Sequence, residues 1–206
     1  MFQILFILDY TDAVVEGYTL TNMKSLEKAH INICETGSKK ADISIYQFDS
    51  INCETSATHL IQGICNVRSL SLTIDEVVSK LSIHVLIEFK YLGVGFNGRE
   101  TWLVEFLHCV PNLKTLTLNF PDDAGTRWKA LRMKVPSCLS FHLKEIEISC
   151  FDTRMIEMVS YFLDNAMVLE KLIMSMAALT WRQKWEAQNQ LLQFLKRSKK
   201  CLIVIL

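Results

Sequence analysis

Leu113-Lys-Thr-Leu116-Thr-Leu118 is the stretch that decides the fold of this chain. It is one of five clear copies of the pattern apolar-x-x-apolar-x-apolar, which span residues 67–72, 89–94, 113–118, 143–148 and 169–174. From Leu70, the fourth residue of the first copy, to Leu92, Leu116, Ile146 and Leu172, the steps are 22, 24, 30 and 26 residues. A pattern that returns at nearly constant intervals predicts a stack of similar units that share one core.

Weaker copies of the same pattern extend the repeat toward the start of the chain. They lie at residues 2–7 and 26–31, again 24 residues apart. Between residues 33 and 66 the pattern blurs, and there residues 43–48 predict a strand and residues 59–64 a helical turn. The long 30-residue step carries a segment with Pro121, Gly125 and Pro136, which predicts an insertion rich in loops.

The local patterns within each unit predict a strand followed by a helix. Apolar and polar residues alternate at the end of each copy, so leucine and isoleucine face a core while Ser, Thr, Glu or Lys face solvent. Apolar stripes at helical spacing follow two of the copies, and the second begins behind the possible caps Asp152 and Thr153. The stripes consist of Trp102, Leu103, Phe106 and Leu107, ended by Pro111, and of Ile156, Val159, Leu163 and Ala166.

The last 27 residues predict one more helix and one more strand. Thr180 and Gln183 have the spacing of a capping box, which places a helix start at this point. The apolar residues of this helix are expected to point inward, and residues 201–206 are expected to form a buried final strand. The inward residues are Trp181, Trp185, Leu192 and Leu195.

Together these patterns predict an α/β leucine-rich-repeat solenoid, a right-handed superhelix like that of ribonuclease inhibitor. The observed steps are close to the roughly 20 to 29 residues of such repeats. One unit cannot bury its apolar face alone, so the units must stack.

Composition restricts the function classes. The chain has 22 basic and 22 acidic residues, so no net field attracts nucleic acid or an anionic membrane, and neither is expected as a partner. No apolar run is long enough to cross a bilayer, and no secretion signal is recognisable. The seven cysteines are odd in number and scattered, which is typical of a reducing compartment. We therefore expect a cytoplasmic or nuclear location.

The sequence toward the end of the chain resembles a known family. Val135-Pro-Ser-Cys-Leu-Ser-Phe-His-Leu143-Lys-Glu-Ile-Glu-Ile148 and the stretch from Met158 to Leu172 are similar to the FBD domain of plant F-box/leucine-rich-repeat proteins. The resemblance covers residues 135–206, including a terminal helix from residue 191 to 198, and residues 18–31 resemble the repeat region of the same family. It implies irregular repeats over residues 1–134 and, over residues 135–206, an FBD domain that continues and caps the solenoid.

The resemblance also implies a function. In that family an F-box docks on a Skp-type adaptor of a ubiquitin ligase, and the repeats and FBD hold the protein to be ubiquitinated. No proline-led, leucine-rich segment precedes the repeats here, so the F-box is expected to be missing, and an apolar opening at Phe2 and residues 4–7 is expected to need an upstream segment or a partner. Recognition of a protein target is thus implied, whereas the adaptor is a partner only where an upstream F-box exists.

Two alternatives to this reading stay open. Gly93-Val-Gly95-Phe-Asn-Gly98 follows a strand and precedes a helix, and Asp122 and Asp123 come about 24 residues later, which is the arrangement of a dinucleotide-binding enzyme. The simpler interpretation is a turn that glycine permits, because the acidic pair follows a proline in the insertion. The other alternative is a truncated paralogue that has no function.

Other chemical signals have simpler explanations in the fold. Cys138, His142 and Cys150 are the nearest approach to a zinc site, but without paired C-x-x-C spacing they are expected to be structural. The basic run 196–200 could bind phosphate or act as a nuclear signal, and the two tryptophans near it could stack on bases; a solvated helix end and core packing are the simpler accounts. We therefore expect no catalytic residue, metal or cofactor.

The polar face of the predicted strands is the candidate surface for a protein partner, because solenoids commonly bind partners on the aligned strands. The residues expected on it are Ser69, Ser71, Thr73, Tyr91, Thr115, Thr117, Asn119, Glu145, Glu147 and Lys171.

Overall fold

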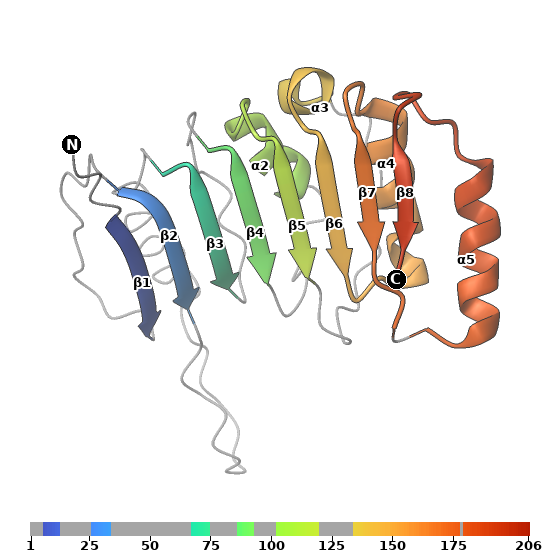
Figure 1. Ribbon diagram of the computed structural model, residues 1–206, viewed down its shortest axis with the longest axis horizontal. Coiled ribbons are helices and arrows are strands. Elements are labelled where there is room, and N and C mark those ends of the chain that lie inside the picture. Colours follow the sequence, from blue (N-terminus) through green and yellow to red (C-terminus); the bar gives the residue numbers. More distant parts are fainter. Residues whose placement is uncertain are drawn as a thin grey trace, which may run out of the picture.

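The computed structural model describes residues 6–12, 26–33, 67–74, 86–92, 102–119, 134–177 and 179–206. These residues form one parallel sheet in which eight strands follow one another in chain order (Figure 1). The predicted α/β class with parallel strands is therefore confirmed. The strands are β1 (Phe6–Asp12), β2 (Leu26–Ile33), β3 (Ser69–Ile74), β4 (Glu88–Leu92), β5 (Thr115–Asn119), β6 (Glu145–Ser149), β7 (Lys171–Met174) and β8 (Leu202–Ile205).

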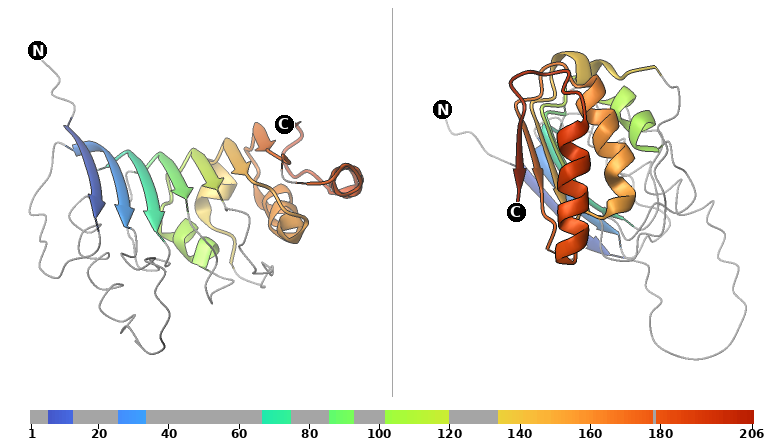
Figure 2. Two further views of the ribbon diagram at one scale, coloured as in Figure 1. Left: turned by 90° about the horizontal axis from the view of Figure 1, so that it is seen from below. Right: turned by 90° about the vertical axis from the view of Figure 1, so that its right-hand side faces the viewer.

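The described helices lie on one side of this sheet, except that the last of them stands beyond the β8 end (Figure 2). In the part of the chain described, no helix combines the length and the apolar composition that a bilayer crossing requires. The helices are α2 (Trp102–Cys109), α3 (Ser137–Phe141), the 3₁₀ turn η1 (Thr153–Met155), α4 (Ile156–Asn165) and α5 (Trp181–Gln193).

The core lies between the sheet and the helices and is built from rows of side chains that cross the strands. Leu116 of β5 pairs in register with Phe89 on one side and Ile146 on the other, and all three are buried. The ring of Phe89 also contacts that of Phe106 in α2, with ring centroids 4.3 Å apart. Burying each such side chain contributes roughly 1.5 to 3 kcal/mol, which is why the strands keep this register.

The predicted repeat in β4 is wrong by three residues. Phe89, not Leu92, stands opposite Leu70 and Leu116, so the copy in this unit begins at Leu86. The copy predicted at residues 2–7 is displaced in the same way, because Leu8 pairs with Ala29, the fourth residue of the copy at 26–31. Since successive strand residues point to opposite faces, an odd displacement exchanges the buried and the exposed face.

The first two predicted helices are confirmed. Leu103, Phe106 and Leu107 of α2 are buried against the sheet, and so are Val159 and Leu163 of α4. Of the two predicted caps before α4, the aspartate caps η1 instead, and Thr153 is the first residue of that turn. The aspartate Oδ1 accepts a hydrogen bond from a backbone N–H of the turn at 2.8 Å. This pair is Asp152 and Arg154.

The helix α5 begins where it was predicted to begin, but the side of the helix that is buried differs from the prediction. Thr180 and Gln183 form the capping box, and each side chain accepts from the other residue's backbone N–H. The prediction of which residues point into the core is wrong, because Ala187 and Leu191 are the buried residues of this helix. The exposed residues are Trp181, Trp185, Leu192 and Leu195.

The chain between α5 and β8 corrects two further predictions. The helix ends at Gln193, so the basic run 196–200 is a connecting loop and not a helix end. This loop is attached to the body by the buried Ser198, whose hydroxyl donates to the Leu169 carbonyl at 2.6 Å. Strand β8 forms next to β7 as expected, but it is not buried, since Leu202 is mostly exposed.

Several predictions fall outside the described residues. They are the strand at 43–48, the helical turn at 59–64, the opening residues 2–5, the glycine motif 93–98 and the insertion as far as residue 133.

Candidate protein-binding face

The sheet face that the helices leave uncovered carries two rows of mostly polar side chains, and we call it the open face. Each row crosses the strands in register, because residues paired between parallel strands point the same way. The first row is Lys28, Ser69, Glu88, Thr115, Glu145 and Lys171, and the second is His30, Ser71, Lys90, Thr117, Glu147 and Ile173.

Most residues predicted for this face lie on it. The predicted residues that belong to the two rows are half-buried, and so is Asn119 at the end of β5. Half-burial is expected for side chains that stand on a sheet beside their neighbours. Thr73 pairs with Asn32 and Leu92 through the backbone, and its side chain lies outside the described set.

The prediction that Tyr91 lies on the open face is wrong. Its side chain is only 2% exposed and points into the core, where its ring lies 6.4 Å from that of Phe89. The residues of β4 on the open face are Glu88 and Lys90, both exposed. The signal that could have found them is Leu86, which begins an equally good copy of the repeat pattern three residues earlier.

Small and charged groups alternate across the open face. Thr115 and Thr117 are short and lie between the charged pair of β4 and the two carboxylates of β6. One of these, Glu145, has an oxygen 3.9 Å from the Lys171 nitrogen. Beyond β7 the rows become apolar, because Leu202 and Val204 of β8 continue them. The face thus offers polar groups at its centre and an apolar border.

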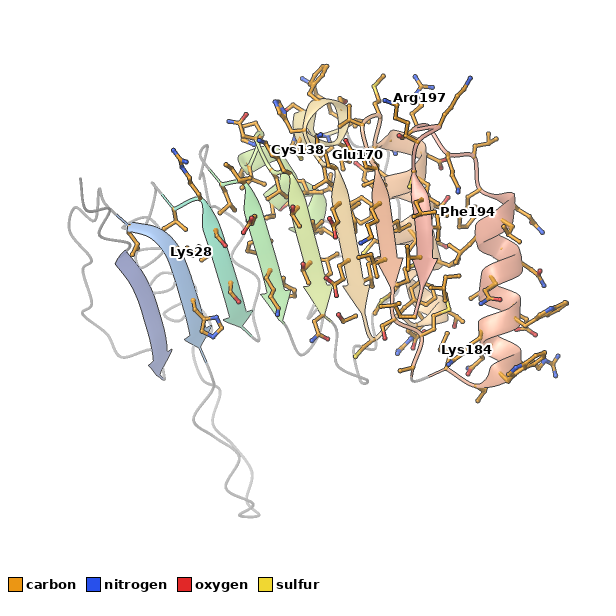
Figure 3. The ribbon with its side chains drawn as sticks, in the orientation of Figure 1. Lys28, Cys138, Glu170, Lys184, Phe194 and Arg197 are labelled. Carbon is orange, nitrogen blue, oxygen red and sulfur yellow. The ribbon has the colours of Figure 1, made fainter. Side chains whose placement is uncertain are left out.

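The rim at the amino ends of the strands carries another ion pair. Lys144 donates to Glu170 at 2.8 Å, and this contact holds the pKa of the Glu170 carboxyl below its usual value. Figure 3 shows Glu170 at this end of β7. Both side chains are more than half exposed, so water and salt screen the pair and its effect on stability is small.

The thiol of Cys138 lies in the core. It is buried and donates to the Leu107 carbonyl at 3.4 Å. Burial raises its pKa to about 12. Across the described segments, no three His, Cys, Asp or Glu side chains gather to form a metal site.

We expect Cys138 to resist alkylation in the folded protein. With a pKa of about 12, roughly one thiol in ten thousand is ionised at pH 8, and burial blocks the reagent as well. Native protein treated with iodoacetamide and mapped by mass spectrometry should carry the label at the half-buried Cys150 before Cys138, and urea should remove the difference. Equal labelling of Cys150 and Cys138 in the native protein would contradict the expectation, because it would show that the reagent reaches the core around Cys138.

A family model named FBD matches residues 133–174, a segment that includes β6, α4 and β7. This segment of the chain is thus similar to the FBD family. The resemblance to the plant F-box/LRR/FBD proteins is confirmed by this match and by the curated relatives.

These relatives come from Arabidopsis thaliana. An F-box/LRR-repeat protein is 31% identical over 191 residues, which cover 81% of this chain and 37% of the relative. A putative F-box protein is 28% identical over 200 residues, with 81% of this chain and 39% of the relative covered. A putative F-box/FBD/LRR-repeat protein is 37% identical over 109 residues, or 50% of this chain and 24% of the relative. No solved structure matches the chain significantly.

Proposed function

We propose that this chain recognises a protein target and belongs to the target-binding part of an F-box-type ubiquitin-ligase receptor. The observation that carries the proposal is the open face, with its registered rows of hydroxyl and charged groups. We further propose that the parallel sheet in chain order is the strand layer of a leucine-rich-repeat solenoid, with the FBD region as its later units. The repeated pattern and the names of the relatives support this.

The dimensions of the open face suit a protein more than a small ligand. Strands lie about 4.8 Å apart, so the rows from β2 to β8 extend over roughly 30 Å. A partner that spans them meets the charges of β4, the threonines of β5 and the carboxylates of β6 in turn. Such an arrangement gives specificity mainly by matching charges, because a misplaced partner would bring like charges together.

Glu147 is the residue from which we expect the largest contribution. It lies between Thr117 and Ile173 in its row, and no described residue forms an ion pair with it. A basic or hydroxyl-rich group of the target can therefore reach it without breaking an ion pair between described residues. Attachment to a ligase through a Skp-type adaptor is the part of the proposal that requires an F-box, and the site of action would be the cytoplasm or nucleus.

The test exchanges charge on the open face without changing the net charge. Lys90→Glu with Glu147→Lys is compared with the wild type and with Lys134→Glu plus Glu157→Lys, a matched exchange of exposed residues off this face. Each chain is tagged, expressed in plant cells and purified, and the bound proteins are quantified by mass spectrometry. We expect one set of proteins to be retained by the wild type and the control and lost from the open-face variant. Equal retention by all three would contradict the proposal.

A further inference from the structure

The helix α5 exposes a straight line of large apolar side chains, which we call the α5 stripe. It consists of Trp181, Trp185 and Leu192, which are 82%, 57% and 83% exposed, and it continues at Leu195 beyond the helix end. Their spacing of four and then seven residues aligns them on one side of the helix. A single exposed leucine is ordinary, but aligned tryptophans and leucines mark an interaction site.

The position of α5 explains why the stripe is uncovered. α5 packs on α4 at the end of the described helix layer (Figure 2). Its buried residues are Ala187 and Leu191, and at 100° per residue these lie about a third of a turn around the helix from the stripe. The apolar arc of α5 is therefore wider than the part that the body covers. The remaining part has the shape that a further neighbouring helix would need.

The charged residues near the stripe are mostly basic. Residues 180–206 contain six basic residues and one acidic residue, although the whole chain is neutral. The acidic residue, Glu186, is already paired with Arg182 at 3.0 Å. Lys184 lies near the start of α5 and Arg197 in the loop after it, so the basic residues stand near the two ends of the stripe (Figure 3). A partner that carries negative charge near both of its ends is thus favoured.

From these observations we propose that the α5 stripe binds an acidic amphipathic helix of a partner protein. The apolar side of that helix packs on the tryptophans and leucines, and its carboxylates face Lys184 and the loop 196–200. Helices commonly bind in this way, with anchors three to four residues apart. Tryptophan is among the residues that contribute most to such contacts.

Other occupants fit the surface less well. A second copy of the chain would bring its own basic loop against this one, so like charges would oppose a dimer. Nucleic acid could stack on Trp181 and Trp185, but it offers nothing apolar to Leu192 and Leu195, which are as exposed as the first tryptophan. The stripe lies on α5, whereas the open face is formed by the strands.

The experiment uses the full 206-residue chain and a labelled synthetic helix of about 18 residues, or five turns, with leucines on one side and glutamates elsewhere. Binding is followed by fluorescence anisotropy. Two matched peptides replace the glutamates by lysines or the leucines by serines. We expect only the acidic amphipathic peptide to bind, more weakly at high salt.

Four variants locate the contact. Two double variants should each weaken binding by roughly tenfold or more. They are Trp181→Ala with Trp185→Ala, which removes the aromatic anchors, and Lys199→Glu with Lys200→Glu, which reverses the charge of the loop. Gln190→Ala, exposed on the other side of α5, and the open-face exchange Lys90→Glu with Glu147→Lys should leave it unchanged. The tryptophans are exposed, so their replacement should not affect folding, which circular dichroism verifies.

Several results would overturn the proposal. They are no binding of the acidic peptide, equal binding of either matched peptide, and stronger binding of single-stranded DNA or of phosphatidylserine vesicles than of the peptide. A dimer in sedimentation equilibrium that disappears in the double tryptophan variant would assign the stripe to self-association instead.

Discussion

Leu116→Asp is expected to unfold the protein, whereas Thr117→Asp, one residue further along β5, should leave it folded. Leu116 is fully buried in the middle of its row, and aspartate there would place an unpaired carboxylate among apolar side chains. That burial costs several kcal/mol, to be compared with a total stability of about 5 to 15 kcal/mol for a typical domain. Thr117 is on the open face, so its aspartate stays hydrated and should change stability by about 1 kcal/mol or less.

Both variants carry the same poor strand former, so intrinsic strand preference cancels in the comparison. Solubility and circular dichroism would show whether Leu116→Asp unfolds the protein. Urea titration would measure the change in stability caused by Thr117→Asp. If the two variants behaved alike, the assignment of faces in β5 would be wrong, and with it the open face.

Phe162→Ala should lower the free energy of unfolding by about 3 to 5 kcal/mol, because it removes a fully buried ring and leaves a cavity. Phe162 lies in α4, inside the FBD match, and its ring meets that of Tyr161 edge-on at 6.0 Å. For a chain of this length the melting temperature should fall by roughly 6 to 20 °C. Urea titration and thermal unfolding measure both quantities.

The matched control is Phe141→Ala. This ring is 69% exposed at the end of α3, so its removal should change stability by about 0.5 kcal/mol or less. A similar loss in both variants would mean that Phe141 is covered in solution.

The strands near Leu116 and Ile146 could be predicted from sequence, because each has a single alternation that fits a half-buried strand. Near Phe89 two copies of the pattern overlap, one starting at Leu86 and one at Phe89 itself. Only pairing with the adjacent strands decides between them. The choice of the wrong copy placed Tyr91 on the open face and missed Lys90.

The faces of α5 were unpredictable for a different physical reason. Periodicity identifies which residues share a side of a helix, but the side that is buried depends on where the neighbouring helix lies. Trp181 and Trp185 were assigned to the core because they are large and apolar, yet the buried side of α5 carries Ala187 and Leu191. The basic run 196–200 was likewise assigned to the helix, which in fact stops at Gln193.

The strand order has a consequence for how such proteins change over generations. Among the described strands, each is hydrogen-bonded to the strands directly before and after it in the chain. A duplication or deletion of one whole strand-and-helix unit therefore requires no rethreading of the rest. It lengthens or shortens the sheet and shifts the spacing of its surface groups by about 4.8 Å. Related genes could thus acquire new binding specificities by altering the number of units while each remaining unit keeps its own packing.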